Sequence, residues 1–248
     1  MDPIEQFEIK SLMPMVRMGG HDISFTNSAL YMFVIVVLVS TLLIGATAQR
    51  AIIPGRLQSI AEMTYEFVAY LVRGSAGTEG MKFFPFVFTL FMFVLFANLI
   101  GLIPYSFTIT SQVIVTATLA LTVFLIVVIY GLWKNGLHFL GLFVPKGVPI
   151  IILPLVTVIE VLSFLTRPVS HSIRLFANML AGHIALQIFA GFVIMLAGLG
   201  VVGWFAAVLP FAMIVALFAL ELLVAVLQAF IFTLLTCIYL NDAIHPGH

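Results

Sequence analysis

Charged side chains are scarce in this chain. Ten Lys plus Arg and ten Asp plus Glu among 248 residues make it 8% charged, whereas soluble domains carry about 25% charged residues. The two signs balance, so the total charge does not favour nucleic acid as a partner. Hydrophobic residues make up 63% of the chain. This composition excludes an ordinary soluble domain and predicts an all-α integral membrane protein.

The sequence also lacks the motifs of common enzymes. Its one cysteine, Cys237, has no second cysteine with which to form an intramolecular disulfide. There is no Gly-rich phosphate loop, no CxxC or HExxH metal signature and no GxSxG elbow. We therefore expect no catalytic chemistry of its own, no cofactor and no metal site.

Long apolar runs dominate what is present. A spanning helix needs roughly 20 apolar residues, and runs of this kind cover 27–48, 83–104 and 112–133. The charged segment 57–80 has an apolar side and predicts an amphipathic helix on the membrane surface. The N-terminal segment 1–26 precedes the first span, and we expect one membrane domain over 1–248.

A nearly uncharged tract follows Pro149 and runs to Leu240. Its breaks predict two long helices, 149–199 and 203–240, which bring the total to about five or six hydrophobic helices. At 1.5 Å per residue the second would be about 55 Å long. Because this exceeds the bilayer thickness, we expect the two helices to be tilted or kinked.

Basic residues are distributed unevenly between the early loops. None lies between 104 and 111, so the positive-inside rule places that loop and the N-terminus outside, and the two basic loops in the cytoplasm or the mitochondrial matrix. The basic residues of those two loops are Arg50, Arg56, Arg73, Lys82, Lys134 and Lys146.

Three charged residues, Glu160, Arg174 and Glu221, lie inside apolar segments. A charge at a helix centre costs about 2.5 to 3.5 kcal/mol, so such residues usually line a pathway. A guanidinium keeps its proton and cannot relay one. It can block passing protons and lower the pKa of a carboxyl group that approaches it. The alternative role for Arg174 is a buried salt bridge, although no carboxylate lies one turn away.

Helical angles separate the polar residues around Arg174. At about 100° per residue, Asn178 shares the face of Arg174, whereas His183 points to the opposite side. Gln187 follows His183 on its own face, which suits a hydrogen-bonded path. The alternative for His183 is a core histidine bonded to a backbone carbonyl.

The last helix carries a polar stripe of Glu221, Gln228 and Tyr239. A hairpin turning near 198–203 would allow Glu221 to meet His183. Glu160 shares a face with Arg174 only if the helix continues through Pro168, which proline opposes.

Other polar residues favour structural interpretations. We expect Asn98 to form an interhelical hydrogen bond, Arg167 to extend to an interface, and His171 to lie at an interface.

Two other functions fit parts of the pattern. A self-contained ion-coupled secondary transporter could bind an anion at Arg174, but it predicts internal repeats, and none links the two halves. A haem- or quinone-binding subunit needs facing histidines on two helices, whereas His171 and His183 lie about 120° apart on one stretch.

Two motifs, "RLFANMLAGH" and "ELLVAVLQAFIFTLLTCIYL", resemble subunit a of the F-type ATP synthases. The similarity extends along most of the chain and is weakest in the first 25 residues. The order of the histidine and the acid resembles alphaproteobacterial and mitochondrial members. The resemblance implies a proton channel of two offset half-channels, with the last two helices as a tilted hairpin against a ring of c subunits.

The resemblance also implies roles for individual residues. Arg174 would face the ring carboxylates, with Asn178 and Gln228 nearby. Glu160 and Ser170 would serve the side facing the ATP-making head, and His183 with Glu221 the opposite half-channel. Further implied partners are b-type peripheral stalk subunits, and the implied location is the bacterial inner membrane, or the mitochondrial inner membrane as an alternative.

Overall fold

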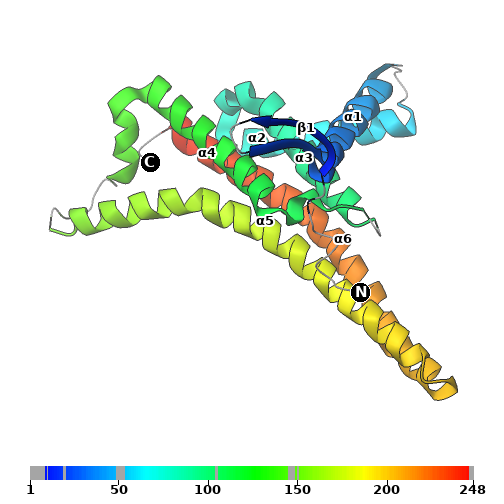
Figure 1. Ribbon diagram of the computed structural model, residues 1–248. Coiled ribbons are helices and arrows are strands. Elements are labelled where there is room, and N and C mark those ends of the chain that lie inside the picture. The colour runs from blue at the N-terminus through cyan, green and yellow to red at the C-terminus, as the bar shows by residue number, and fades with distance from the viewer. Residues whose placement is uncertain are drawn as a thin grey trace.

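The computed structural model of the chain describes residues 9, 11–18, 21–48, 54–103, 106–144, 149 and 151–245. Helices dominate this part of the molecule (Figure 1). Within it, five helical stretches are long and apolar enough to cross a membrane. The prediction of an all-α membrane protein is therefore confirmed.

The helices follow one another with short connections. The α-helices are α1 (Asn27–Ala48), α2 (Arg56–Gly80), α3 (Phe84–Gly101), α4 (Val113–Asn135), α5 (Leu153–Ala197) and α6 (Val201–Ile244). Short 3-10 helices are η2 (Met81–Phe83), η3 (Ile109–Ser111) and η4 (Gly136–Phe143). Of the sequence expectations, Arg50, the end of the second span at Pro104 and Lys146 lie outside the described residues.

The N-terminal segment forms a hairpin that the hydropathy pattern does not reveal. Strands β1 (Ser11–Met18) and β2 (His21–Thr26) pair antiparallel, with Arg17 opposite Asp22. The sheet has two strands, so β1 is an edge strand and can contain Pro14, which lacks an N–H. Thr26, the last residue of β2, is followed directly by α1.

Helices α5 and α6 form a long antiparallel hairpin (Figure 1). They contain 45 and 44 residues, which corresponds to about 65 Å each at 1.5 Å per residue. Helix α5 continues through Pro168 and bends along its length (Figure 1). Glu160 and Arg174 therefore belong to one helix, which the sequence left open.

The C-terminal half of α6 lies inside the helical bundle, where it contacts α2, α3 and α4. Phe232 and Leu240 of α6 are almost fully buried, with Val87 of α3 and Val127 of α4 in the same cluster. Large apolar side chains near the hairpin turn, such as Trp204, are exposed. Such a surface suits lipid or another membrane protein.

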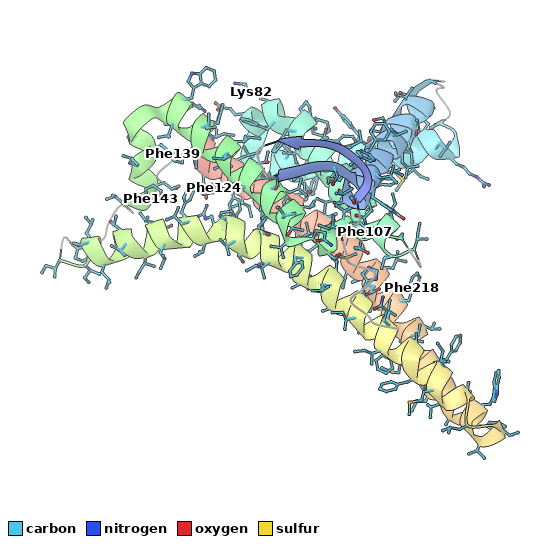
Figure 2. All side chains as sticks on the ribbon, in the orientation of Figure 1. Lys82, Phe107, Phe124, Phe139, Phe143 and Phe218 are labelled. Carbon is cyan, nitrogen blue, oxygen red and sulfur yellow. The ribbon has the colours of Figure 1, made fainter. Side chains whose placement is uncertain are left out.

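Aromatic rings join the start of α5 to the bundle. Phe124, Phe139 and Phe143 lie between α4, η4 and α5 (Figure 2). Their ring centroids are 5.1, 6.3 and 5.3 Å from that of Phe164. These edge and tilted contacts hold the first part of α5 against α4 and η4.

Helix α4 supplies the groups that cap the C-terminus of α6. Asn135 Nδ2 donates to the Ala243 carbonyl oxygen at 2.7 Å, and Lys134 Nζ donates to that of Ile244 at 3.4 Å. Lys134 also pairs with Glu79 of α2. A cation here is favourable because the last carbonyls of a helix carry partial negative charge.

Replacing this cation should loosen the junction of α2, α4 and α6. We expect Lys134→Met to lower the thermal transition of the purified complex by a few degrees, because a capping donor and an ion pair are lost. Arg56→Met removes a positive charge from an exposed position at the start of α2 and should not lower the transition. Equal shifts for both variants would contradict the capping role.

Candidate functional site

Arg174 lies on the outer side of α5. Its side chain is exposed and forms no ion pair within the described part of the chain. One turn later, Asn178 Nδ2 donates to Gln228 Oε1 of α6 at 3.0 Å. Gln228 is buried. The guanidinium is thus presented outward beside an amide pair that joins the two hairpin helices.

His183 lies on the opposite, buried side of α5. Its Nε2 atom is 3.1 Å from Oγ1 of Thr108, which immediately precedes η3. His183 is 7% exposed and Thr108 is fully buried. His183 lies nine positions after Arg174, so the helical period places the buried titratable group on the face opposite the exposed fixed charge.

Glu221 of α6 packs against Gly182, the residue before His183. A Cβ at Gly182 would collide with the Glu221 carboxyl group, so the contact depends on the absence of a side chain there. Both carboxyl oxygens are buried and have no hydrogen-bond partner among the described residues. The hairpin therefore brings Glu221 to the same level of α5 as His183.

Asn98 of α3 forms a contact with α6 one turn from this acid. Asn98 Nδ2 of α3 donates to the Ala225 carbonyl oxygen of α6 at 3.2 Å, which confirms the predicted interhelical bond. Ala225 follows Glu221 by one turn. Back on α3, Gly101 accepts a 3.3 Å hydrogen bond from Thr108, so α3, the η3 segment, α5 and α6 all meet here.

Several polar atoms in this region have no partner in the described structure. They are Oδ1 of Asn98 and Oγ1 of Thr110, besides the Glu221 oxygens. Buried polar groups in proteins are nearly always hydrogen-bonded, to water where no protein group is available. The chemistry of this region therefore suits ordered water next to a carboxyl group and an imidazole. Gln187, one turn after His183, is half-buried.

A second group of polar residues lies nearer the start of α5. Glu160 is half-buried and Ser170 is exposed on this helix. Arg167 pairs with Asp242 of α6 at 2.6 Å and lies 4.9 Å from the ring centroid of Tyr239. This pairing of Arg167 with an acid near the end of α6 was not foreseen from the sequence, and the reach of Arg167 to an interface stays a prediction.

His171, which we expected at an interface from the sequence, is buried between α5 and α6. It is 4% exposed, and its Nε2 atom lies 3.3 Å from the carbonyl oxygen of Phe232 on α6. The centroid of its ring lies 4.2 Å from the centroid of the Phe232 ring. His171 therefore links α5 to α6 in the interior of the protein.

Sequence reasoning missed the hydroxyl groups that contact α5. Thr108 contacts His183, and Thr116 of α4 is 3.1 Å from Ser172 of α5. The available signal was "YSFTITS", residues 105–111, where hydroxyls cluster between two apolar spans. Read alone, this stretch looks like an uncharged turn.

Comparison with known proteins identifies the family of this chain. A family model described as ATP synthase A chain matches residues 29–241. The chain is 63% identical over 248 residues to the ATP synthase subunit a of Nitrobacter winogradskyi, with 100% of both chains covered. The chain belongs to the ATP synthase A chain family.

Other relatives in this family are equally similar. The subunit a of Nitrobacter hamburgensis is 64% identical over 248 residues, covering 100% of both chains. That of Xanthobacter autotrophicus is 63% identical over 247 residues, covering 100% of this chain and 99% of the relative. Strands β1 and β2 precede the residues that the ATP synthase A chain model matches. The polar groups described above lie within the matched residues, except Asp242, which follows them directly.

A substitution that adds one methyl group at Gly182 tests whether the contact with Glu221 matters for function. Gly182→Ala should displace the Glu221 carboxyl group and lower the rate of gradient-driven ATP synthesis in membrane vesicles several-fold. Folding should not suffer, because alanine favours helix over glycine. Gly191→Ala adds the same methyl to α5 in open space and is the matched control. An unaffected rate in Gly182→Ala would show that the position of Glu221 is unimportant.

Proposed function

We propose that this chain forms the proton path of the ATP synthase membrane sector, as two offset half-channels that load and unload carboxyl groups on a ring of c subunits. The observation that carries the proposal is the arrangement on α5. Arg174 is exposed on one face, and His183 with the adjacent Glu221 is buried on the other.

Arg174 would act as the barrier between the half-channels. A charge exposed to hydrocarbon costs about 2.5 to 3.5 kcal/mol, and Arg174 has no carboxylate partner in the described chain. A carboxylate from another protein would relieve that cost. The nearby positive charge would in turn lower the pKa of that carboxyl group and drive release of its proton. A ring carboxyl group would have to lose its proton in this way before it passes Arg174.

The buried polar residues around Glu221 and His183 would form the half-channel that opens to the outside. Protons would pass Asn98 and Thr110, whose side-chain oxygens have no partner in the described chain, and then reach Glu221 and His183. Gln187 continues the same face of α5. The uncharged segment 106–112 lies at this end, where the distribution of basic residues places the outer side.

The second half-channel would lead from Arg174 toward Glu160. These two residues are separated by 14 positions of one continuous helix, or about 21 Å. Ser170 lies between them, and Tyr239 packs on Arg167 at the same end. Protons released at Arg174 would leave here, driven by about 2.3 kcal/mol per charge per 100 mV. The location would be a bacterial inner membrane, with b-type stalk subunits completing the assembly.

The barrier role predicts uncoupling. In vesicles with the assembled enzyme, Arg174→Ala should abolish ATP-driven proton pumping and ATP synthesis, whereas passive proton flow should persist or rise. Arg56→Ala removes an exposed arginine from α2 and should behave as the native chain. Pumping that survives in Arg174→Ala would contradict the proposal.

The two half-channels also predict opposite sidedness. Cysteines at Thr110 and Ser170 should react with a small, membrane-impermeant thiol reagent from opposite sides, Thr110→Cys from the outside and Ser170→Cys from the cytoplasm. The native Cys237 lies in the hydrophobic core rather than beside the unpartnered polar atoms that mark the proposed path, so it should give little background. Right-side-out and inverted vesicles distinguish the sides, and reaction of both cysteines from one side would exclude two offset paths.

A further inference from the structure

Thr108 has an unusual position for a residue in a connection between two membrane helices. It is fully buried, and its hydroxyl oxygen is 3.1 Å from His183 Nε2 and 3.3 Å from the Gly101 carbonyl oxygen. These neighbours belong to α5 and α3, so one hydroxyl joins two helices through a loop residue.

The local backbone fixes this hydroxyl in place. The Ser111 hydroxyl donates to the Thr108 carbonyl oxygen at 2.6 Å, and the Ser111 N–H donates to it at 3.3 Å. On the other side, a Cβ at Gly101 would lie 2.7 Å from Cγ2 and 3.3 Å from Oγ1 of Thr108. Thr108 therefore sits directly on the last turn of α3 with little room to move.

His183 Nε2 and the Gly101 carbonyl oxygen require different hydrogen-bonding roles of the Thr108 hydroxyl group. A hydroxyl donates one proton and can also accept, whereas a carbonyl oxygen only accepts. His183 Nε2 accepts when it carries no proton and donates when it carries one. If Nε2 is bare, the hydroxyl can donate to it. If Nε2 is protonated, the hydroxyl accepts from it and donates to Gly101.

We infer that Thr108 is a positioning residue for the proton path, whose hydroxyl keeps His183 Nε2 hydrogen-bonded whether or not that nitrogen carries a proton. The Gly101 carbonyl makes this possible because it receives the hydroxyl proton in the second state. A buried imidazole nitrogen would otherwise lose its partner in one state, and that state would be disfavoured. The inference rests on the proposed function, since it requires His183 to change protonation during transport.

The test separates the hydroxyl from the methyl group of Thr108. Thr108→Val keeps the shape and removes the hydroxyl, and it should slow both ATP-driven pumping and passive proton flow about tenfold in vesicles with normal amounts of assembled enzyme. Thr108→Ser keeps the hydroxyl and should restore at least half of the native rate. Thr122→Val, at an exposed position of α4, is the matched control.

Two results would overturn the inference. A native rate in Thr108→Val would show that the hydroxyl is unnecessary, and equal impairment in Thr108→Ser would show that only packing matters. If the valine variant does not assemble, Gly101→Ala supplies a second test. It keeps the hydroxyl but displaces it, so a native rate there would equally overturn the inference.

His183→Ala in the same assay distinguishes this inference from the proposed function. If His183→Ala transports protons normally, the half-channel proposal fails at His183, and the inference fails with it. If His183→Ala is impaired while Thr108→Val is normal, the half-channel proposal stands and only the role of Thr108 is wrong.

Discussion

The antiparallel register of α5 and α6 determines where every candidate functional group lies. Three contacts at successive levels fix it: Arg167 with Asp242, Asn178 with Gln228, and Gly182 with Glu221. Lipid is as apolar as the helices themselves, so hydrophobic burial does little to choose among registers in a membrane. Close packing at small residues and hydrogen bonds between polar side chains make that choice. A shift by one turn would separate all three pairs.

The same register explains why the hairpin tolerates its polar residues. Glu221, Gln228 and Tyr239 lie on one stripe of α6, and each contacts α5. Their polar groups are thereby kept from hydrocarbon, where they would be costly. Arg174 differs, because it lies outside this seam and gains no partner from the described chain. The exposed apolar side chains around it make that face suitable for another membrane protein.

Local periodicity was enough to predict much of this arrangement. The opposite faces of Arg174 and His183 and the stripe on α6 follow from 100° per residue, because a helix transmits direction over short distances without help from the rest of the fold. The continuity of α5 through Pro168 could not be predicted. Proline removes one backbone hydrogen bond and crowds the preceding turn, and contacts such as the packing of Phe164 on α4 and η4 hold the helix together.

Contacts between distant segments were equally inaccessible from the sequence. Thr108 and His183 are 75 residues apart, and so are Arg167 and Asp242. No periodic pattern relates such pairs, because they meet only when the bundle closes. The β1–β2 hairpin was missed for another reason. Two short strands with no further neighbours leave only a weak alternation in the sequence.

Because Arg174 and His183 lie on the same helix, α5, a movement of that helix changes the positions of both. Arg174 and His183 are about 13 Å apart along the axis of α5 and point in opposite directions. A rotation of α5 about its axis would therefore turn Arg174 away from its outer face and pull His183 from Thr108 at the same time. Arg167 with Asp242 lies before Arg174 along α5, and Asn178 with Gln228 lies after it. Because these contacts resist rotation on both sides of Arg174, the exposed charge and the buried polar residues around His183 are held in a fixed relation to each other.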